Sequence, residues 1–198
     1  ASGDRSIAIG SGANATEGAA LAIGRQAEAT GSSAVSVGYL SKAKKNVAVA
    51  LGVNNNVDGE QSTAVGSSNT IATDANQATV IGRTNKINRA GSFAGGFSNV
   101  TNGERNVAVG SENTTTGEET IGIGTKVIAG TGKTIAIGSV ASDAGKYLQT
   151  IARGNDTVNP ATGQVNNVFA LAIGNGAQAD GKAKSASGMI AIGEEVKA

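Results

Sequence analysis

Few residues in this chain have the chemistry of catalysis or metal binding. The sequence contains no cysteine and no histidine, which removes the thiol nucleophile, the commonest general base and the commonest zinc ligands. Glu118 and Glu119 are neighbours, but adjacent residues of a strand point to opposite faces and do not form a catalytic pair. Asp58-Gly59-Glu60 lacks the ligand spacing of a calcium-binding repeat. We therefore expect no catalytic residue, no metal site and no cofactor.

The side chains best suited to binding a ligand are basic. They form two groups in the sequence: Lys42, Lys44 and Lys45, then Arg83, Lys86 and Arg89. If several chains associate around one axis, each group becomes a ring of positive charge that favours acidic matrix or glycan partners. Alternatively, these basic residues bind no ligand and form a solvated face that keeps the protein soluble. The whole chain has 16 basic and 15 acidic residues, so its net charge does not favour nucleic acid or a membrane surface.

A repeat that runs through the whole sequence must position these side chains. The pattern aliphatic, small, aliphatic, glycine first occurs at Ile7-Ala8-Ile9-Gly10. It then ends at Gly24, Gly38, Gly52, Gly66, Gly82, Gly96, Gly110, Gly124, Gly138, Gly174 and Gly193. Eight of these eleven intervals equal the first one, from Gly10 to Gly24. A period this strict indicates stacked supersecondary units, and we expect a single domain over 1–198.

Each repeat has room for two short strands and two turns. A second segment follows each glycine, with small inward positions such as Ala27 and Ala29 on either side of the polar Glu28, which predicts a strand with one wet face. A helical crossover does not fit into so short a repeat, because the connection alone takes a dozen or more residues. We therefore predict an all-β fold, a parallel β-solenoid with one coil for each repeat. Turn pairs such as Thr30-Gly31 close the coil, and asparagines that recur at one inward position predict a stacked amide ladder: Asn55, Asn69, Asn85, Asn99 and Asn113.

The first strand of each repeat is apolar on both faces, so one face needs a partner outside the coil. We expect an obligate homo-oligomer, with the aliphatic pair inside each coil and the small residues at the subunit interface, because small side chains allow sheets of different chains to approach closely. The reverse assignment remains open. The expected interface residues are Ala8, Ala22, Ala50, Ala64, Ala94, Ala108, Ala136, Ala172 and Ala191.

The repeat resembles the head of YadA-like trimeric autotransporter adhesins. The family motif runs approximately Asn-Ser-Val-Ala-Ile-Gly-x-x-Ser and recurs with the same short period as the repeat of this chain. The closest segments are Asn46-Val47-Ala48-Val49, Asn106-Val107-Ala108-Val109-Gly110-Ser111 and Thr134-Ile135-Ala136-Ile137-Gly138-Ser139. The resemblance implies a left-handed parallel β-roll that forms a homotrimer, carried at the tip of an outer-membrane-anchored fibre on Gram-negative bacteria.

Such heads attach to host cells or to host extracellular matrix proteins of the collagen, fibronectin or laminin class, and they promote autoaggregation or biofilm formation. The family's coiled-coil stalk and membrane anchor are not found in this sequence. We see no signal peptide and no apolar run of about 18 residues, and Ala1 follows no initiator Met. We therefore expect a piece of a longer protein, with membrane anchoring through other segments.

The largest departure from the repeat is the stretch 139–168, which contains Tyr147 and the chain's single proline, Pro160. It is predicted either as a solvent loop or as a ligand contact or inter-subunit clasp, to which Tyr147 would contribute. Smaller additions lie between Gly66 and Gly82 and around 182–187. Phe93 and Phe97 break the aliphatic rule and indicate local repacking around glycine or a functional patch.

Three other classes of protein use solenoids. The acyltransferases on left-handed β-helices require a catalytic histidine, which is absent here. Ice-binding solenoids present ranked threonines, whereas Thr114, Thr115 and Thr116 fall in one repeat and do not recur in its neighbours. A segment of a phage tail fibre can have the same trimeric β-solenoid architecture, and it remains the alternative to an adhesin head.

Overall fold

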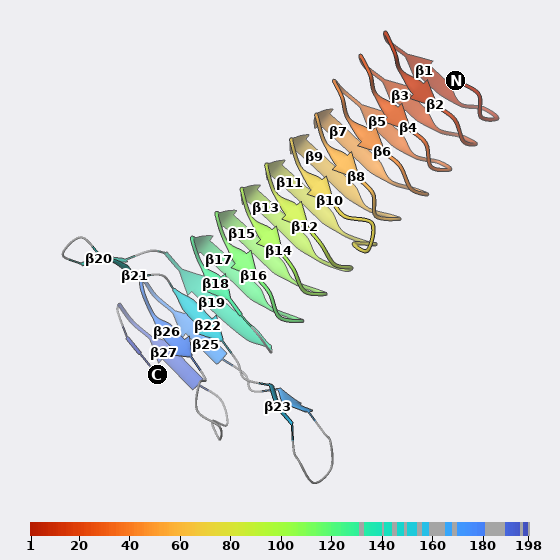
Figure 1. Cartoon of the computed structure of the whole chain (residues 1–198). Coiled ribbons are helices and arrows are strands. Elements are labelled where there is room, and N and C mark those ends of the chain that lie inside the picture. The colour runs from red at the N-terminus through yellow and green to blue at the C-terminus, as the bar shows by residue number, and fades with distance from the viewer. Residues whose placement is uncertain are drawn as a thin grey trace. The chain divides into compact units, whose positions relative to one another are not determined.

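The computed structural model describes residues 1–130, 133–139, 141–143, 146–148, 150–153, 156–158, 165–167, 170–180, 189–194 and 196–197. The chain divides into two compact units, Ala1–Ser98 and Asn99–Ala198. All regular elements among the described residues are β-strands (Figure 1). None of the described residues lies in a helix that is long and apolar enough to cross a membrane.

The first unit contains two parallel sheets whose strands alternate along the chain. Sheet A has the order β1 (Ile7–Ile9), β3 (Leu21–Ile23), β5 (Val35–Val37), β7 (Val49–Val53), β9 (Thr63–Ser67), β11 (Thr79–Arg83) and β13 (Phe93–Phe97). Sheet B has the order β2 (Asn14–Ala15), β4 (Glu28–Ala29), β6 (Lys42–Ala43), β8 (Asn56–Val57), β10 (Thr70–Ile71) and β12 (Lys86–Ile87). One strand of each sheet makes one coil, which confirms the predicted parallel β-solenoid.

The second unit repeats this arrangement. Its sheet A strands are β15 (Val107–Ser111), β17 (Ile121–Thr125), β19 (Thr134–Gly138), β25 (Ala170–Ile173) and β27 (Met189–Ile192). Its sheet B strands are β14 (Val100–Thr101), β16 (Thr114–Thr115), β18 (Ile128–Ala129), β22 (Ile151–Arg153) and β26 (Gln178–Asp180).

The stretch 139–168 does not interrupt the solenoid as one long loop. Its strand β22 pairs in parallel with β18 and β26, so this stretch supplies the sheet B strand of a coil. Two antiparallel hairpins flank β22: β20 (Ala141–Asp143) with β21 (Lys146–Leu148), and β23 (Asp156–Val158) with β24 (Val165–Asn167). The addition around 182–187 lies outside the described residues.

Register between coils follows the period of the sequence repeat. Ala50 pairs with Ala64 and Gly52 with Gly66, so each residue lies on its counterpart in the next coil. The glycine that ends each motif is required by this stacking. Gly52 has φ +114°, and a Cβ built on it would collide with the carbonyl oxygen of Gly66. An L-residue at this position is therefore excluded both by its backbone conformation and by the lack of space.

The turns have a second, shorter period, which is set by residues with a left-handed backbone conformation. Among the residues other than glycine, those with φ between 53° and 57° recur mostly at intervals of seven residues, as at Ser33, Leu40, Val47 and Asn54. These left-handed residues occupy both the turns from sheet A to sheet B, which we call the A-to-B edge, and the turns from sheet B back to sheet A, the B-to-A edge. The predicted Thr30-Gly31 turn is present, but its left-handed residue is Ser33.

The predicted asparagine ladder is present inside the first unit. The Asn69 side chain accepts from the backbone N–H of Asn85 at 3.0 Å and donates to the carboxamide of Asn55 at 3.0 Å. Its Nδ2 also donates to the Gly82 carbonyl at 2.8 Å. In the second unit, the carboxamide of Asn99 accepts from the backbone N–H of Asn113 at 3.0 Å. These fully buried amides satisfy backbone groups that the turns leave unpaired.

Asn69→Ala should lower the free energy of unfolding by about 2 kcal/mol or more, since an unsatisfied buried polar group costs about 1–3 kcal/mol. Asn69→Ser should cost less, because Ser41 already bonds the Gly52 carbonyl at the equivalent position, at 2.8 Å. Urea unfolding of both variants measures the difference. Thr70→Ala, on the outward face of the same coil, is the control, with an expected change under about 0.5 kcal/mol. Equal losses for Asn69→Ala and Thr70→Ala would contradict a structural role for the ladder.

Candidate functional site

The alanines expected at a subunit interface lie inside the coil. Ala22, Ala50, Ala64, Ala94, Ala108, Ala136, Ala172 and Ala191 are fully buried within a single chain, and Ala8 packs against the same core. The prediction that this stripe meets another chain is therefore wrong. The two sheets of a coil lie so close together that their facing positions hold mainly small side chains, as where Ala22 packs in one cluster with Ala27 and Ala29.

The large aliphatic residues of the motif occupy the opposite, outward face of sheet A. Ile9 is 57% exposed, Ile81 50% and Ile192 62%. The prediction that this aliphatic pair fills the coil is therefore wrong: the inward position of sheet A is held mainly by alanine, and the two flanking aliphatic residues of the strand point outward. We call the outward apolar row on sheet A the aliphatic face. Among the described residues, its most exposed members are Ile7, Ile9, Ile81, Val109, Ile123, Ile190 and Ile192.

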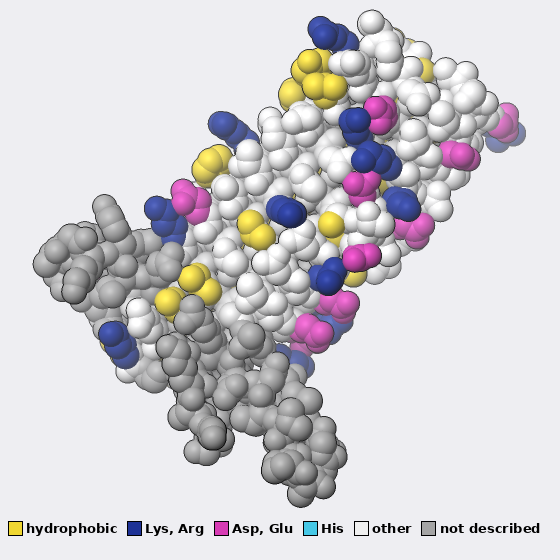
Figure 2. Space-filling view, in the orientation of Figure 1, with side chains coloured by type: hydrophobic (Ala, Val, Ile, Leu, Met, Phe, Trp, Pro, Cys, Tyr) yellow, Lys and Arg dark blue, Asp and Glu magenta, His cyan; other side chains and the backbone are white. Residues whose placement is uncertain are grey.

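Three of the six predicted ligand-binding residues with basic side chains are already paired within the chain. Lys42 Nζ lies 3.0 Å from a carboxylate oxygen of Glu28, one coil away. Lys44 contacts Asp58 at 3.1 Å, and Arg89 contacts Asp74 at 3.1 Å. Figure 2 shows basic and acidic side chains next to one another on the face in view. These pairs neutralise charge locally, which supports the solubilising role that the sequence left open for this face.

The other three predicted basic residues lie in different places. Lys86 is exposed on β12, on the outward face of sheet B, and Lys45 is exposed at the B-to-A edge. Arg83 ends β11 of sheet A, and its guanidinium stacks over the Phe97 ring, 5.7 Å from the ring centroid. The expectation that both basic groups follow one outer strand is therefore wrong for Arg83. Among the described residues, none of these three takes part in an ion pair.

Tyr147 belongs to the hairpin strand β21, where its backbone pairs with that of Ser142. Its side chain lies outside the described part of the structure, so its role in ligand contact stays a prediction. The Phe93 ring lies over Gly95, so near that a Cβ at Gly95 would be 2.9 Å from Phe93 Cε1. The predicted local repacking around glycine at this coil is thus confirmed.

One edge of the first unit carries apolar residues that the sequence analysis missed. Tyr39 and Val53 immediately follow the motif glycines Gly38 and Gly52, and both are exposed. Arg25, one coil earlier, stacks over the Tyr39 ring at 5.3 Å. The signal for them was present in the sequence, since Ser or Thr occupies this position in other coils, as in Ser11, Ser67, Ser111 and Thr125.

The acidic pair Glu118 and Glu119 lies in a turn of the second unit instead of on a strand. Arg105 contacts both, at 3.9 Å and 3.0 Å, and Lys133 contacts Glu119 at 2.7 Å. Hydrogen bonds from Lys133 and then Arg105 lower the pKa of the Glu119 carboxyl. The described residues contain no group of three or more Asp, Glu, His or Cys side chains arranged to hold a metal ion. The acidic pair therefore connects coils electrostatically.

The family model described as the YadA head domain repeat matches residues 1–27, 18–41 and 48–69, all within the first unit. Domains of this family are adhesive modules and not typically enzymes. No curated protein matches the chain.

Glu119→Gln should remove a stabilising contribution that depends on pH. Because the folded-state pKa of Glu119 is lowered, its contribution is present above the unfolded-state pKa and disappears as the pH falls through the folded-state value. Urea unfolding should therefore show the variant less stable than wild type at about pH 7 and equally stable at about pH 2. The exposed Glu194→Gln is the control. A stability difference that is the same at both pH values would contradict the ion-pair network.

Proposed function

We propose that this chain is the head of a trimeric autotransporter adhesin, a proposal supported by the match of the YadA head domain repeat to residues 1–27, 18–41 and 48–69 and by the parallel β-solenoid fold. In this role it stands on the bacterial surface, at the tip of an outer-membrane-anchored fibre. It attaches non-covalently to host extracellular matrix proteins, of the collagen, fibronectin or laminin class, or to host-cell receptors. In the same role, the head domain promotes autoaggregation and biofilm formation and contributes to virulence.

The observation that carries this proposal is the aliphatic face of sheet A. Ile7, Ile9 and Ile81 are each at least half exposed in the single chain, and the row continues in register from coil to coil. A continuous apolar strip of this kind marks an interface. Three copies that turn this face toward a common axis bury it completely, which supports a homotrimer.

Val109→Lys should dissociate the trimer, because a charge on the aliphatic face would be buried at the axis. Light scattering should give a wild-type mass near three times the chain mass of 19.3 kDa, and a variant mass near that of one chain. Circular dichroism should show that Val109→Lys keeps its β-structure, although less stably. Ala108→Lys, which points into the coil, should unfold the chain instead. If the Val109→Lys variant remains trimeric, the aliphatic face of sheet A does not lie at the trimer axis.

Attachment by such a head would rest on avidity. A trimer presents every outward site three times, so weak single contacts combine into strong attachment. Lys86 supports a contact with an acidic partner, because it is exposed on sheet B, away from the aliphatic face, and has no ion-pair partner among the described residues. Three copies of Lys86 would lie at the same height around the fibre.

Lys86→Gln should weaken binding of the trimer to immobilised collagen, fibronectin or laminin by several-fold, through loss of one charge from each of three sites. Surface plasmon resonance at two salt concentrations measures the change and its electrostatic part. Lys197→Gln, which removes an exposed lysine outside both basic groups, is the matched control. No binding of the wild-type trimer to any of these proteins or to host cells would contradict the proposed function.

A further inference from the structure

We propose that the patch formed by Arg25, Tyr39 and Val53 on the A-to-B edge docks against the B-to-A edge of a second copy of this chain. The docking surface on the second copy is formed by its Glu17 and Val47. This contact rests on the homotrimer of the proposed function and defines the height at which neighbouring subunits align. Burial of the aliphatic face alone does not select one alignment of the subunits, whereas this contact between specific residues does.

The patch on the A-to-B edge is apolar at its centre and cationic at one end. Tyr39 is 42% exposed and Val53 47% exposed, and the Arg25 guanidinium lies over the tyrosine ring. Tyr39 lies in the turn two residues after Val37, the last residue of β5, so the patch adjoins the end of sheet A. Aromatic and arginine side chains grouped in this way are typical anchors of protein interfaces.

The B-to-A edge carries a matching pair of residues. Val47 is 52% exposed and has φ 56°, a conformation that is strained for a β-branched residue. Ser33 fills the equivalent turn position one coil earlier, so the fold itself does not require an apolar side chain there. Glu17 is exposed on the same edge. Among the described residues, neither Glu17 nor Arg25 takes part in an ion pair.

Symmetry brings these two edges together. The aliphatic face runs along the stacking direction of the coils, so an axis that buries it must run parallel to that direction. Around such an axis the contacts are heterologous, and each copy offers one edge to the opposite edge of its neighbour. Rotation keeps every residue at its own height.

The heights of the matching residues agree. Glu17 lies in the turn just before β3, and Arg25 lies in the turn just after it. Val47 lies in the turn just before β7, and Val53 ends that strand, whereas Tyr39 follows β5, one coil earlier. Rotation about the axis therefore places the charge of Arg25 beside the opposite charge of Glu17, and the apolar Val53 beside the apolar Val47, with Tyr39 one coil away.

The first unit contains a second instance of this arrangement. Arg83 stacks over Phe97 on the same A-to-B edge. The turn before β11, at the height of Arg83, carries Asp74, whose side chain is 75% exposed. Asp74 already contacts Arg89 of its own chain, yet this exposure leaves the carboxylate open to a second cation. Two arginine–aromatic pairs on one edge thus meet two acidic turns on the other.

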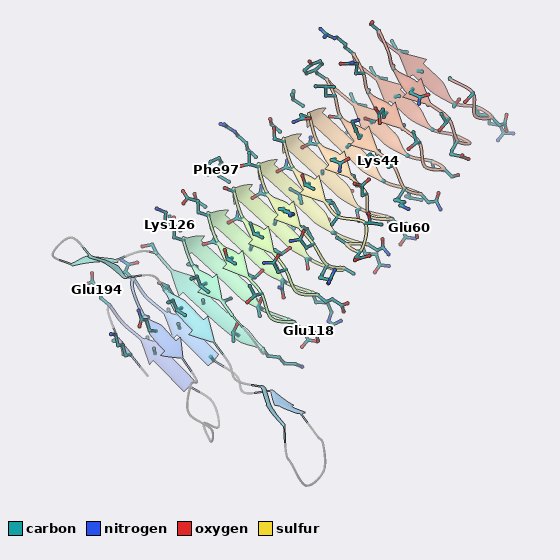
Figure 3. All side chains as sticks on the ribbon, viewed as in Figure 1. Lys44, Glu60, Phe97, Glu118, Lys126 and Glu194 are labelled. Carbon is teal, nitrogen blue, oxygen red and sulfur yellow. The ribbon has the colours of Figure 1, made fainter. Side chains whose placement is uncertain are left out.

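The contact cannot form within one chain. Residues 17 and 25 lie on opposite edges of the same coil, in the turns before and after β3, and the extended segment 20–24 between them spans about 13 Å by itself. Figure 3 shows this separation of edges in the first unit, where Phe97 projects from one edge and Glu60 from the other. A disulfide requires Cα atoms within about 7 Å, so a bond between positions 17 and 25 must join two chains.

Cysteine cross-linking of the full chain tests the proposal on a clean background, because the native sequence has no cysteine. Oxidised Glu17→Cys/Arg25→Cys should migrate as three linked chains on a non-reducing gel and as one chain after reduction. Glu17→Cys/Lys42→Cys, with its second cysteine on the outward face of sheet B, should remain unlinked. Light scattering and circular dichroism verify that both variants stay folded and trimeric.

Two results would overturn the proposal. A folded trimer that cross-links no better than the control means that the edges do not meet, while the trimeric head itself stands. A wild-type chain that is monomeric in solution removes both the contact and the proposed trimer.

Charge reversal gives an independent measurement. Arg25→Glu and Glu17→Arg should each raise the concentration at which the trimer dissociates by about five-fold or more, and the double reversal should restore it. Single variants that dissociate like wild type would contradict the ion pair.

Discussion

The distance between coils is the constraint on which this structure depends. Backbone hydrogen bonds join each coil to the next, and they place every residue directly on its counterpart one repeat later. The side chain at each position must therefore fit next to the side chain at the same position of the neighbouring coil. Glycine can stack on glycine at the end of sheet A, and asparagine can bond asparagine in the interior. On the outward face of sheet B, where identical charges would repel one another, Glu28 is followed by Lys42.

A second constraint is the narrow interior of the coil. Because alanines from both sheets face each other there, little apolar surface is buried inside a single chain. The larger aliphatic residues, which offer more hydrophobic free energy, lie outside and can be used only by association. Sheet A thus separates most of its hydrophobic residues by size: mainly alanines face the interior of the coil, where Ile71 and Ile87 of sheet B also lie, and the larger aliphatic residues of sheet A face outward.

The sequence predicted the architecture because its period is too short for anything but two strands and two turns. It also predicted the asparagine ladder, since the five residues recur at one position. It failed on the direction of Ala8 and Ile9, although small residues at the facing positions Ala13 and Ala15 were a sign of a narrow interior. The left-handed turn residues could not be predicted from local preference, because Leu40 and Val47 do not favour this conformation. Their backbone N–H groups are held there by the preceding coil, as in the bond from Leu40 to Arg25 at 3.1 Å. The exposed patch at Tyr39 was missed because single departures from a repeat carry little statistical weight.

The coil between Gly66 and Gly82 has two extra residues, and its flanking strands nevertheless keep their register: Thr70 pairs with Lys86, and Ile71 with Ile87. The extra length is taken up by the turn at 72–78, where the left-handed positions are nine residues apart instead of seven, at Ser68 and Gln77. The edges of this solenoid can therefore change in length while its sheets do not. In the adhesin head that we propose, such an edge can acquire new epitopes while the pairing of the strands is kept. For protein engineering, the edge of the first unit offers sites where foreign peptides can be displayed at steps of about 4.8 Å from one coil to the next.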